Sequence, residues 1–159
     1  MNATTTRTSH RPGPAQLLQS AALLVGSGIS AWWLTYTRPE KVAAEQGFPL
    51  SEADDVIHSF TLPAWAENTL GVGALVVTVV TAILLIRAWR AGRLGTRWAL
   101  ALLALVPIPM MAGVLWVIAT APIIGANIGL GLGIMAFGPA TLILLVVAVV
   151  MAILAWRAG

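Results

Sequence analysis

The longest uncharged stretch of the chain is its strongest constraint on fold. Between Arg97 and Arg157 no residue carries a charge. Roughly 20 apolar residues cross the hydrocarbon core of a bilayer as a helix, so this stretch is long enough for two crossings. A turn signal divides it, made of Pro122, Gly125, Asn127 and Gly129. We therefore expect membrane-spanning helices at about residues 98–120 and 128–156.

Two further apolar runs lie at residues 15–36 and 63–89. The first is longer than the roughly 7–15 residues of a signal-peptide core, so we interpret it as a retained helix. Only 9% of all residues are charged, whereas about a quarter are in an average soluble domain. The sequence predicts an all-α integral membrane four-helix bundle. Residues 15–159 would form this single domain, after a disordered cytoplasmic tail at residues 1–14.

The charges predict how the bundle is oriented. All six acidic residues fall between Glu40 and Glu67, while Arg7, Arg11, the 90–97 loop and Arg157 are basic. Because cytoplasmic loops are enriched in Lys and Arg, we expect both termini inside, a cytoplasmic loop at 90–97 and an outer loop at 37–62. An arginine-rich composition favours a bacterial cytoplasmic (inner) membrane. The basic clusters only flank apolar runs, which excludes a nucleic-acid partner.

The outer loop contains the signal for a short helix. Ser51 and Asp54 have capping-box spacing, which predicts a helix starting at Glu52. Its apolar residues recur at helical spacing, and they are Ala53, Val56, Ile57 and Phe60. We therefore expect an amphipathic helix in the extracytoplasmic loop between the first and second spans.

Asp54 and His58 are four residues apart, so they can pair on one face of that helix. A carboxylate beside an imidazole occurs in general bases and in metal sites, and Glu45 and Glu67 could join them in space. The alternative is a solvated helix face. Glu52, Asp54, Asp55 and His58 are also candidates for partner binding. The chain has no cysteine, and both histidines lie outside the spans, so no cofactor is expected.

Small residues and prolines mark the spans themselves. Ladders of small residues occur at Ala22, Gly26 and Ser30, and at Gly125, Gly129 and Gly133. Such ladders serve either internal helix packing or a partner interface. Pro107 and Pro109 should kink the third span, and Pro139 the fourth. The kinks either open a cavity, with Pro107, Met111, Trp116 and Asn127 as lining, or mark irregular packing.

The segment "RPEKVAAEQGFP", Arg38 to Pro49, resembles the motif after the first helix of SdpI-like bacterial membrane proteins, whose N-terminal part is a domain of unknown function. Pro39, Glu40, Val42 and Gly47 are in keeping with that motif. Where the family has His followed by an aromatic residue, this chain has Glu45 and Gln46. The resemblance implies a bacterial inner-membrane protein, some relatives being toxin-immunity or signalling proteins. It carries no functional residue over to this chain.

These observations predict a non-enzymatic multi-pass membrane protein that acts as an accessory, immunity or assembly partner of another membrane component. Its expected partners are membrane lipid and either another membrane protein or a second copy. Two alternatives stay open. One is a small-molecule transport or ligand-binding component with a cavity between the third and fourth spans. The other is a surface enzyme or metal site at Asp54, Asp55 and His58.

Overall fold

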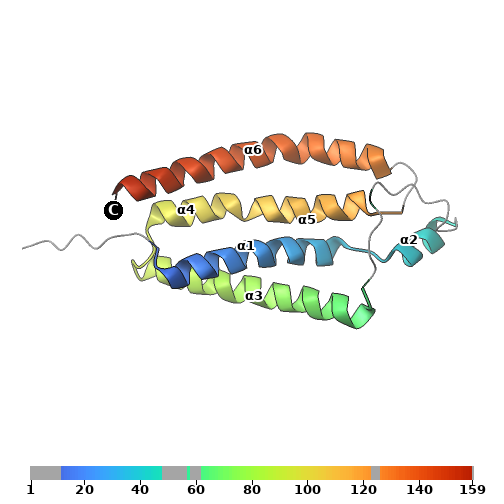
Figure 1. The fold of residues 1–159 in the computed structure, drawn as a ribbon, viewed down its shortest axis with the longest axis horizontal. Coiled ribbons are helices and arrows are strands. Elements are labelled where there is room, and N and C mark those ends of the chain that lie inside the picture. Colours follow the sequence, from blue (N-terminus) through green and yellow to red (C-terminus); the bar gives the residue numbers. More distant parts are fainter. Residues whose placement is uncertain (1–11, 48–56, 58–61, 123–125, 159) are drawn as a thin grey trace, which may run out of the picture.

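The computed structural model describes residues 12–47, 57, 62–122 and 126–158. Within these ranges the chain is helical, without strands (Figure 1). The helices are α1 (Pro14–Thr35), α2 (Pro39–Gln46), α3 (Ala64–Arg90), α4 (Thr96–Leu105), α5 (Pro107–Ala119) and α6 (Ala126–Ala158). By length and composition four helical segments can cross a membrane, namely α1, α3, α4 with α5, and α6. The all-α fold and the four apolar spans are thus confirmed, and they indicate a multi-pass membrane protein.

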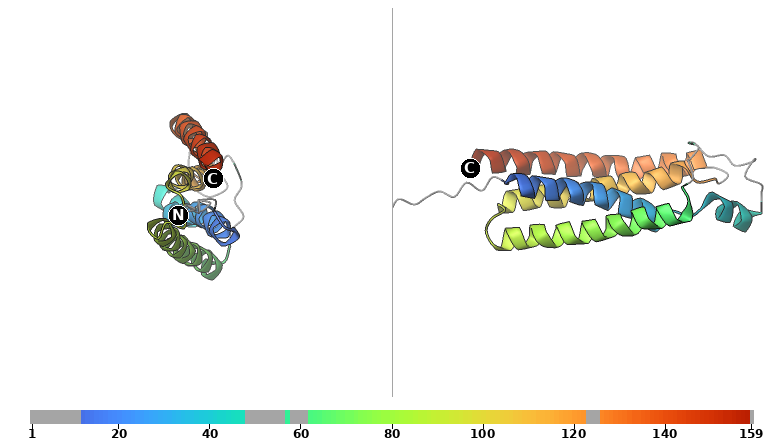
Figure 2. Two further views of the ribbon diagram at one scale, coloured as in Figure 1. Left: turned by 90° about the vertical axis from the view of Figure 1, so that its left-hand side faces the viewer. Right: turned by 60° about the horizontal axis from the view of Figure 1, so that its bottom comes forward.

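The spans lie side by side in a row, and a small buried cluster joins α1, α3 and α4, formed by Leu23, Leu85, Ala88, Leu94 and Leu102. α1 packs between α3 and α5, and α6 packs on α4 and α5. Viewed from the end, α3 and α6 lie at opposite edges of the row (Figure 2). Each edge helix therefore has one side packed against the bundle and one wide exposed side. Lipid can cover the exposed side, because lipid tails are as apolar as leucine.

Glycines on α1 allow close contact with each of its two neighbours, α3 and α5. A Cβ at Gly26 would lie 2.6 Å from Thr78 Oγ1 on α3, and one at Gly28 would lie 3.0 Å from the Pro109 carbonyl oxygen on α5. Gly71 of α3 lies directly against the Trp33 ring, and Gly113 of α5 against the backbone of Gly28. Small residues permit this approach of helix backbones. The row is therefore held most tightly around α1.

Prolines act differently in the last two spans. The third span divides at Val106 into α4 and α5, directly before Pro107. Proline has no N–H for the helical ladder and its ring clashes with the preceding turn, which explains the division. α6 contains Pro139 and continues through it as one arched helix (Figure 1).

A short helix lies in the connection between α1 and α3. Pro39 opens α2 and Glu40 stands in its first turn. Gly47 ends it with a left-handed φ of 72°, and its N–H donates to the Ala43 carbonyl at 2.9 Å. Proline at the start and glycine at the end are common helix boundaries. The helix predicted to begin at Glu52 lies outside the described residues.

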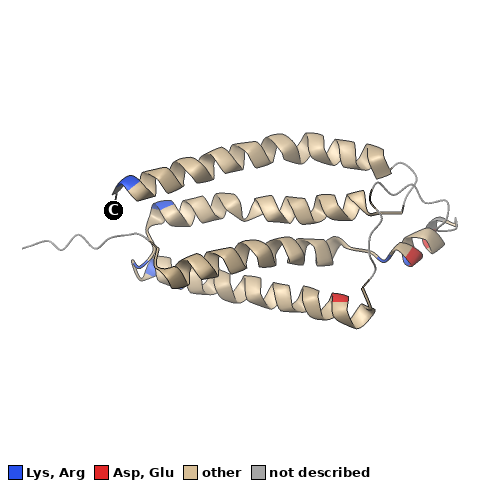
Figure 3. Cartoon of the chain, viewed as in Figure 1, with Lys and Arg blue, Asp and Glu red and all other residues tan. Residues whose placement is uncertain are grey.

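The charges of the described chain separate to the two ends of the row (Figure 3). The basic end contains the start of α1, the turn at residues 91–95 and the end of α6 (Figure 1). Its described charged residues are Arg87, Arg90, Arg93, Arg97 and Arg157. The acidic end contains α2 and the start of α3, with Arg38, Glu40, Lys41, Glu45 and Glu67.

Candidate functional site

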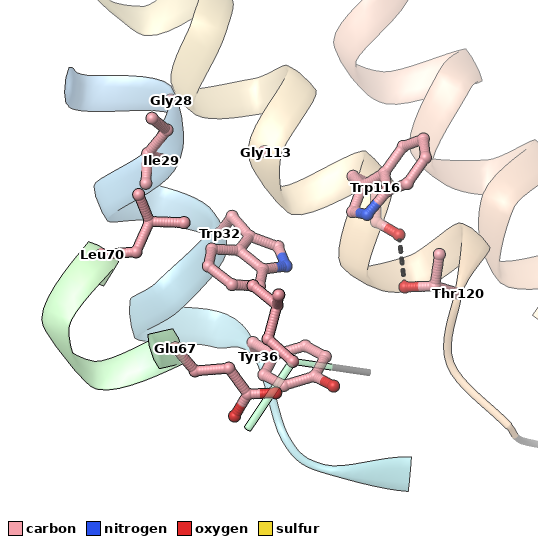
Figure 4. Close-up of a pocket in the computed structure, with 10 residues that line it drawn as sticks. Gly28, Ile29, Trp32, Tyr36, Glu67, Leu70, Gly113, Trp116 and Thr120 are labelled. Carbon is pink, nitrogen blue, oxygen red and sulfur yellow. Dashed lines mark hydrogen bonds between the residues drawn. The ribbon is translucent and has the colours of Figure 1, made fainter. Parts of the chain in front are cut away.

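A hollow of about 290 Å³ lies between α1, α3 and α5 near the acidic end. Two aromatic side chains come from α1 and its end, and a third comes from α5 across the hollow (Figure 4). We call this hollow the aromatic chamber. Its lining residues are Gly28, Ile29, Trp32, Tyr36, Leu62, Glu67, Leu70, Gly113, Trp116 and Thr120. Its surface is largely apolar, as in most small-molecule sites.

The helices position these rings through local geometry. Trp32 and Tyr36 are four residues apart, so they stand on one side of α1, with ring centroids 5.3 Å apart and planes tilted by 34°. Trp116 belongs to the last turn of α5, where the Thr120 hydroxyl donates to its carbonyl at 2.8 Å (Figure 4). Gly28 and Gly113 let α1 and α5 approach closely, which brings Trp116 to the same hollow as Trp32 and Tyr36.

A second hollow of about 300 Å³ adjoins the chamber. We call it the vestibule, and its lining residues are Tyr36, Arg38, Glu40, Leu62, Pro63 and Glu67. Tyr36, Leu62 and Glu67 line both hollows. The vestibule adds Arg38 and Glu40, so it is the polar neighbour of an apolar chamber. The carboxylate of Glu67 consequently stands at the boundary between the two.

Glu67 is buried and takes part in an ion pair. Only 6% of the residue is exposed, in the first turn of α3. The Arg38 Nε and Nη2 atoms donate to its Oε2 at 3.1 and 3.0 Å. The Arg38 side chain is 45% exposed, so the pair joins a buried carboxylate to a partly solvated cation. Both bonds end on one oxygen, and no described residue donates to Oε1.

The charges around Glu67 favour a cation. At the acidic end, two described cations, Arg38 and Lys41, stand against three carboxylates, Glu40, Glu45 and Glu67, which gives one net negative charge. Lys41 Nζ lies 3.8 Å from Glu45 Oε1 on the exposed side of α2. Exposed pairs of this kind contribute little. The charged residues that line the two hollows are Arg38, Glu40 and Glu67, so their lining also carries one net negative charge, which attracts positively charged ligands.

The residues predicted to line a cavity lie in different places. Trp116 lines the aromatic chamber, which is formed with the first and second spans and not with the fourth. Pro107 lines a separate hollow nearer the basic end. Met111 is half-buried on α5 and Asn127 is exposed on α6, and neither lines the chamber or the vestibule.

The predicted glycine ladder on the fourth span faces α5. A Cβ at Gly129 would lie 3.4 Å from Ile118 Cγ2, and one at Gly133 would lie 2.8 Å from Leu115 Cδ2. Both glycines therefore serve the packing of α6 inside the chain. Gly125 lies outside the described residues, as do the outer-loop candidates Glu52, Asp54, Asp55 and His58.

Glu45, Glu67 and His58, which could converge in space on the sequence alone, are not seen as a group in the described residues. Glu45 lies against Lys41, Glu67 pairs with Arg38, and His58 is outside the described ranges. Within those ranges, no three His, Asp or Glu side chains are placed to hold a metal ion. The structure thus provides no described geometry for the proposed enzyme or metal site.

Sequence reasoning gave no role to Trp32, Tyr36 or Arg38, and named Glu67 only as a possible neighbour of the outer loop. A signal was available. The packed side of α3 repeats at helical spacing through Glu67, Gly71, Ala74, Thr78, Thr81, Leu85 and Ala88. A carboxylate on a stripe of small residues is expected to be buried and paired.

No family model matches the chain, and no match is found among the curated proteins or the solved structures. The resemblance to SdpI-like proteins stays a prediction. The function must therefore be argued from the geometry of the chain itself.

Proposed function

We propose that this chain is a non-enzymatic, ligand-binding protein of the bacterial inner membrane that takes a small organic cation into the aromatic chamber. The observation that carries the proposal is the position of Glu67. Its buried carboxylate lies between an apolar hollow with three aromatic side chains and a polar vestibule. This combination accommodates a ligand with an apolar body and a positive charge.

Two interactions would favour a cation over a neutral molecule of the same shape. The faces of Trp32, Tyr36 and Trp116 attract positive charge, with about 0.5–2 kcal/mol per contact as the site loses water. The Glu67 carboxylate attracts the positive charge of the ligand, and its Oε1 accepts no hydrogen bond from a described residue. The volume of about 290 Å³ limits the ligand to roughly one aromatic ring and a small headgroup.

The direction of entry follows from the charges. Basic segments favour the cytoplasmic side, so we infer that both termini are inside and that the acidic end faces outward. A ligand would then pass from the outer surface through the vestibule, past Glu67 and Tyr36, into the chamber. The N–H of Ile57 donates to the Ala119 carbonyl at 3.0 Å, so this residue of the connection between α2 and α3 lies at the end of α5, next to Thr120 of the chamber.

The test compares two probes of equal shape on the protein in phosphatidylcholine nanodiscs. Benzyltrimethylammonium has the charge, and neopentylbenzene is its uncharged carbon isostere. We expect the cation to bind about tenfold more tightly, because one cation–π contact of about 1.4 kcal/mol corresponds to that ratio. Isothermal titration calorimetry measures both. Equal affinity for the two probes, or binding of neither, would contradict the proposal.

A matched pair of tryptophan variants locates the site. Trp116→Leu removes one wall of the chamber and should weaken binding of the cation several-fold. Trp65→Leu removes a tryptophan of α3 that is 73% exposed and lines neither hollow, so affinity should stay unchanged. If both variants bind like the unmodified protein, the ligand lies elsewhere.

A second candidate is the accessory function, with a helix of another membrane protein against α6. In its most apolar window α6 is only 6% buried, whereas the first span is 28% buried. Its outer stripe, opposite α4 and α5, is exposed and aliphatic and comprises Ile128, Met135, Leu142, Val146, Val149 and Ile153. This stripe is the widest bare surface that a partner helix could cover.

Because the chain has no cysteine, single cysteines can test this surface by crosslinking in native membranes. A partner helix predicts one discrete adduct from Met135, Leu142 and Val149, which are seven residues apart, and none from the buried Ala148. An adduct of twice the mass of the chain would instead identify a second copy. Absence of adducts along the whole stripe would show that lipid covers it.

A further inference from the structure

The basic end contains a second pair of connected hollows, independent of the proposed cation site. A slot of about 370 Å³ between α3 and α4 is lined almost entirely by carbon, with Leu85, Ala99 and Leu102 among its walls. A hollow of about 360 Å³ lies at the turn between the same helices, lined by Thr96, Arg97 and Trp98. Both include Trp89 and Leu94 in their lining. The apolar slot therefore continues into a polar mouth.

No Asp or Glu of the described ranges lies near the arginines around this mouth. The described acidic residues, Glu40, Glu45 and Glu67, all lie at the opposite end of the row (Figure 3). Arg97 donates through Nη1 to the Leu154 carbonyl at 2.9 Å, which anchors its side chain and leaves its other N–H groups for a ligand. Arg90 and Arg93 belong to the same turn region. Uncompensated guanidinium groups of this kind suit a phosphate.

Two further polar groups line the mouth. The Trp89 indole N–H donates to the Thr96 hydroxyl at 3.3 Å, which orients Thr96 beside Arg97. The Trp98 Nε1 is buried and has no hydrogen-bond acceptor in the described structure. A buried donor without an acceptor is costly and uncommon. An acceptor group at the mouth would reduce that cost after a small rearrangement of the ring.

We propose that this slot and its mouth bind one anionic phospholipid from the leaflet at the basic end. One acyl chain lies in the slot between α3 and α4, and the phosphate accepts hydrogen bonds from Arg97 and Thr96. Basic pockets between transmembrane helices on the cytoplasmic side are suited to anionic headgroups. A soluble phosphate would use the mouth alone and leave the apolar slot without a ligand.

The test uses the full chain and counts bound lipids by native mass spectrometry. Phosphatidylglycerol and phosphatidylcholine with identical acyl chains are compared, so only the headgroup differs. We expect phosphatidylglycerol to bind at least fivefold more tightly, because one arginine near an anionic headgroup contributes about 1 kcal/mol, which corresponds to that ratio. Equal affinity of the unmodified protein for both lipids would overturn the proposal.

Two variants separate the mouth from the slot. Arg97→Gln should weaken phosphatidylglycerol about fivefold and phosphatidylcholine less, because the choline cation already opposes the attraction of its phosphate to Arg97. Arg157→Gln is the control, because it removes the same charge from the same end outside both hollows. Ala99→Trp fills the slot and should weaken both lipids. An equal loss from both arginine variants would mean a diffuse electrostatic effect and would contradict a defined site.

Inorganic phosphate distinguishes a lipid from a free anion. At millimolar concentration it should not displace phosphatidylglycerol, because it cannot replace the contacts of the acyl chain. Displacement by phosphate alone, with no effect of Ala99→Trp, would show an anion site without a lipid slot and would overturn the proposal. If a variant fails to fold, the relative affinity of the unmodified protein for the two lipids still tests the proposal.

Discussion

The two ends of the row are formed by the same four spans and differ in the sign and the pairing of their charged side chains. At the acidic end Arg38 pairs with Glu67 and Lys41 with Glu45, and α1 contacts α3 and α5 through glycines. At the basic end five arginines face no described carboxylate, and α3 and α4 leave a slot between them. This difference is the basis for the two sites of opposite sign that we propose, one around a carboxylate and one for an anion.

Burial follows the small and polar residues, not the most apolar ones. The first span has a mean hydropathy of 1.4 and is 28% buried, while α6 has a mean hydropathy of 2.7 and is 6% buried. In water the order would be reversed. Lipid covers leucine and valine side chains as well as protein does. The contacts between helices are therefore formed by glycine, serine and paired charged residues. Variants at those contacts should therefore separate the well-packed regions from the bare ones.

The largest loss of stability is expected from Gly71→Leu. The Cβ of the new side chain would enter the Trp33 ring, so α1 and α3 must separate near the acidic end. Overpacking of this kind costs about 3 kcal/mol, and the free energy of unfolding in mixed micelles should fall accordingly. Gly73→Leu is the matched control on the same helix, because nothing lies within 4 Å of its Cβ. Equal destabilisation by both would refute the packing described for α1 and α3.

A smaller loss is expected from Arg38→Gln. It leaves the buried Glu67 carboxylate without its cation, and breaking a fully buried pair costs about 3–5 kcal/mol. Because Arg38 is 45% exposed, we expect about 2 kcal/mol after allowance for solvent. The double variant with Glu67→Gln should recover most of the loss in the same unfolding experiment. An additive double variant would mean that the two side chains do not interact.

The smallest effect is expected on α6. Gly133→Leu would meet the flexible end of Leu115 at 2.8 Å, and that side chain can move, so the cost should be about 1 kcal/mol. Gly138→Leu faces open space and should leave stability unchanged. The same unfolding assay compares the two. A larger loss from Gly138→Leu would show that the outer side of α6 is covered by a second copy.

Apolar length predicted the spans because a bilayer fixes how many residues a helix needs. The break before Pro107 follows from the missing N–H, as expected. α2 was not predicted, although Pro39 and Gly47 mark its ends. The chamber could not be predicted from spacing alone. It depends on which helices are neighbours, and Trp32, Glu67 and Trp116 meet only because α1 lies between α3 and α5.

The central claim is that the buried carboxylate of Glu67 selects a cation. The most direct measurement is the affinity for benzyltrimethylammonium in phosphatidylcholine nanodiscs of the unmodified chain, Glu67→Gln and Glu45→Gln. Both variants remove one negative charge from the acidic end, but Glu45 lies outside the chamber and the vestibule. We predict about a tenfold loss for Glu67→Gln, which corresponds to about 1.4 kcal/mol of lost attraction between the carboxylate and the cation, and no change for Glu45→Gln. Full affinity of Glu67→Gln would contradict the account, and so would an equal loss in both variants.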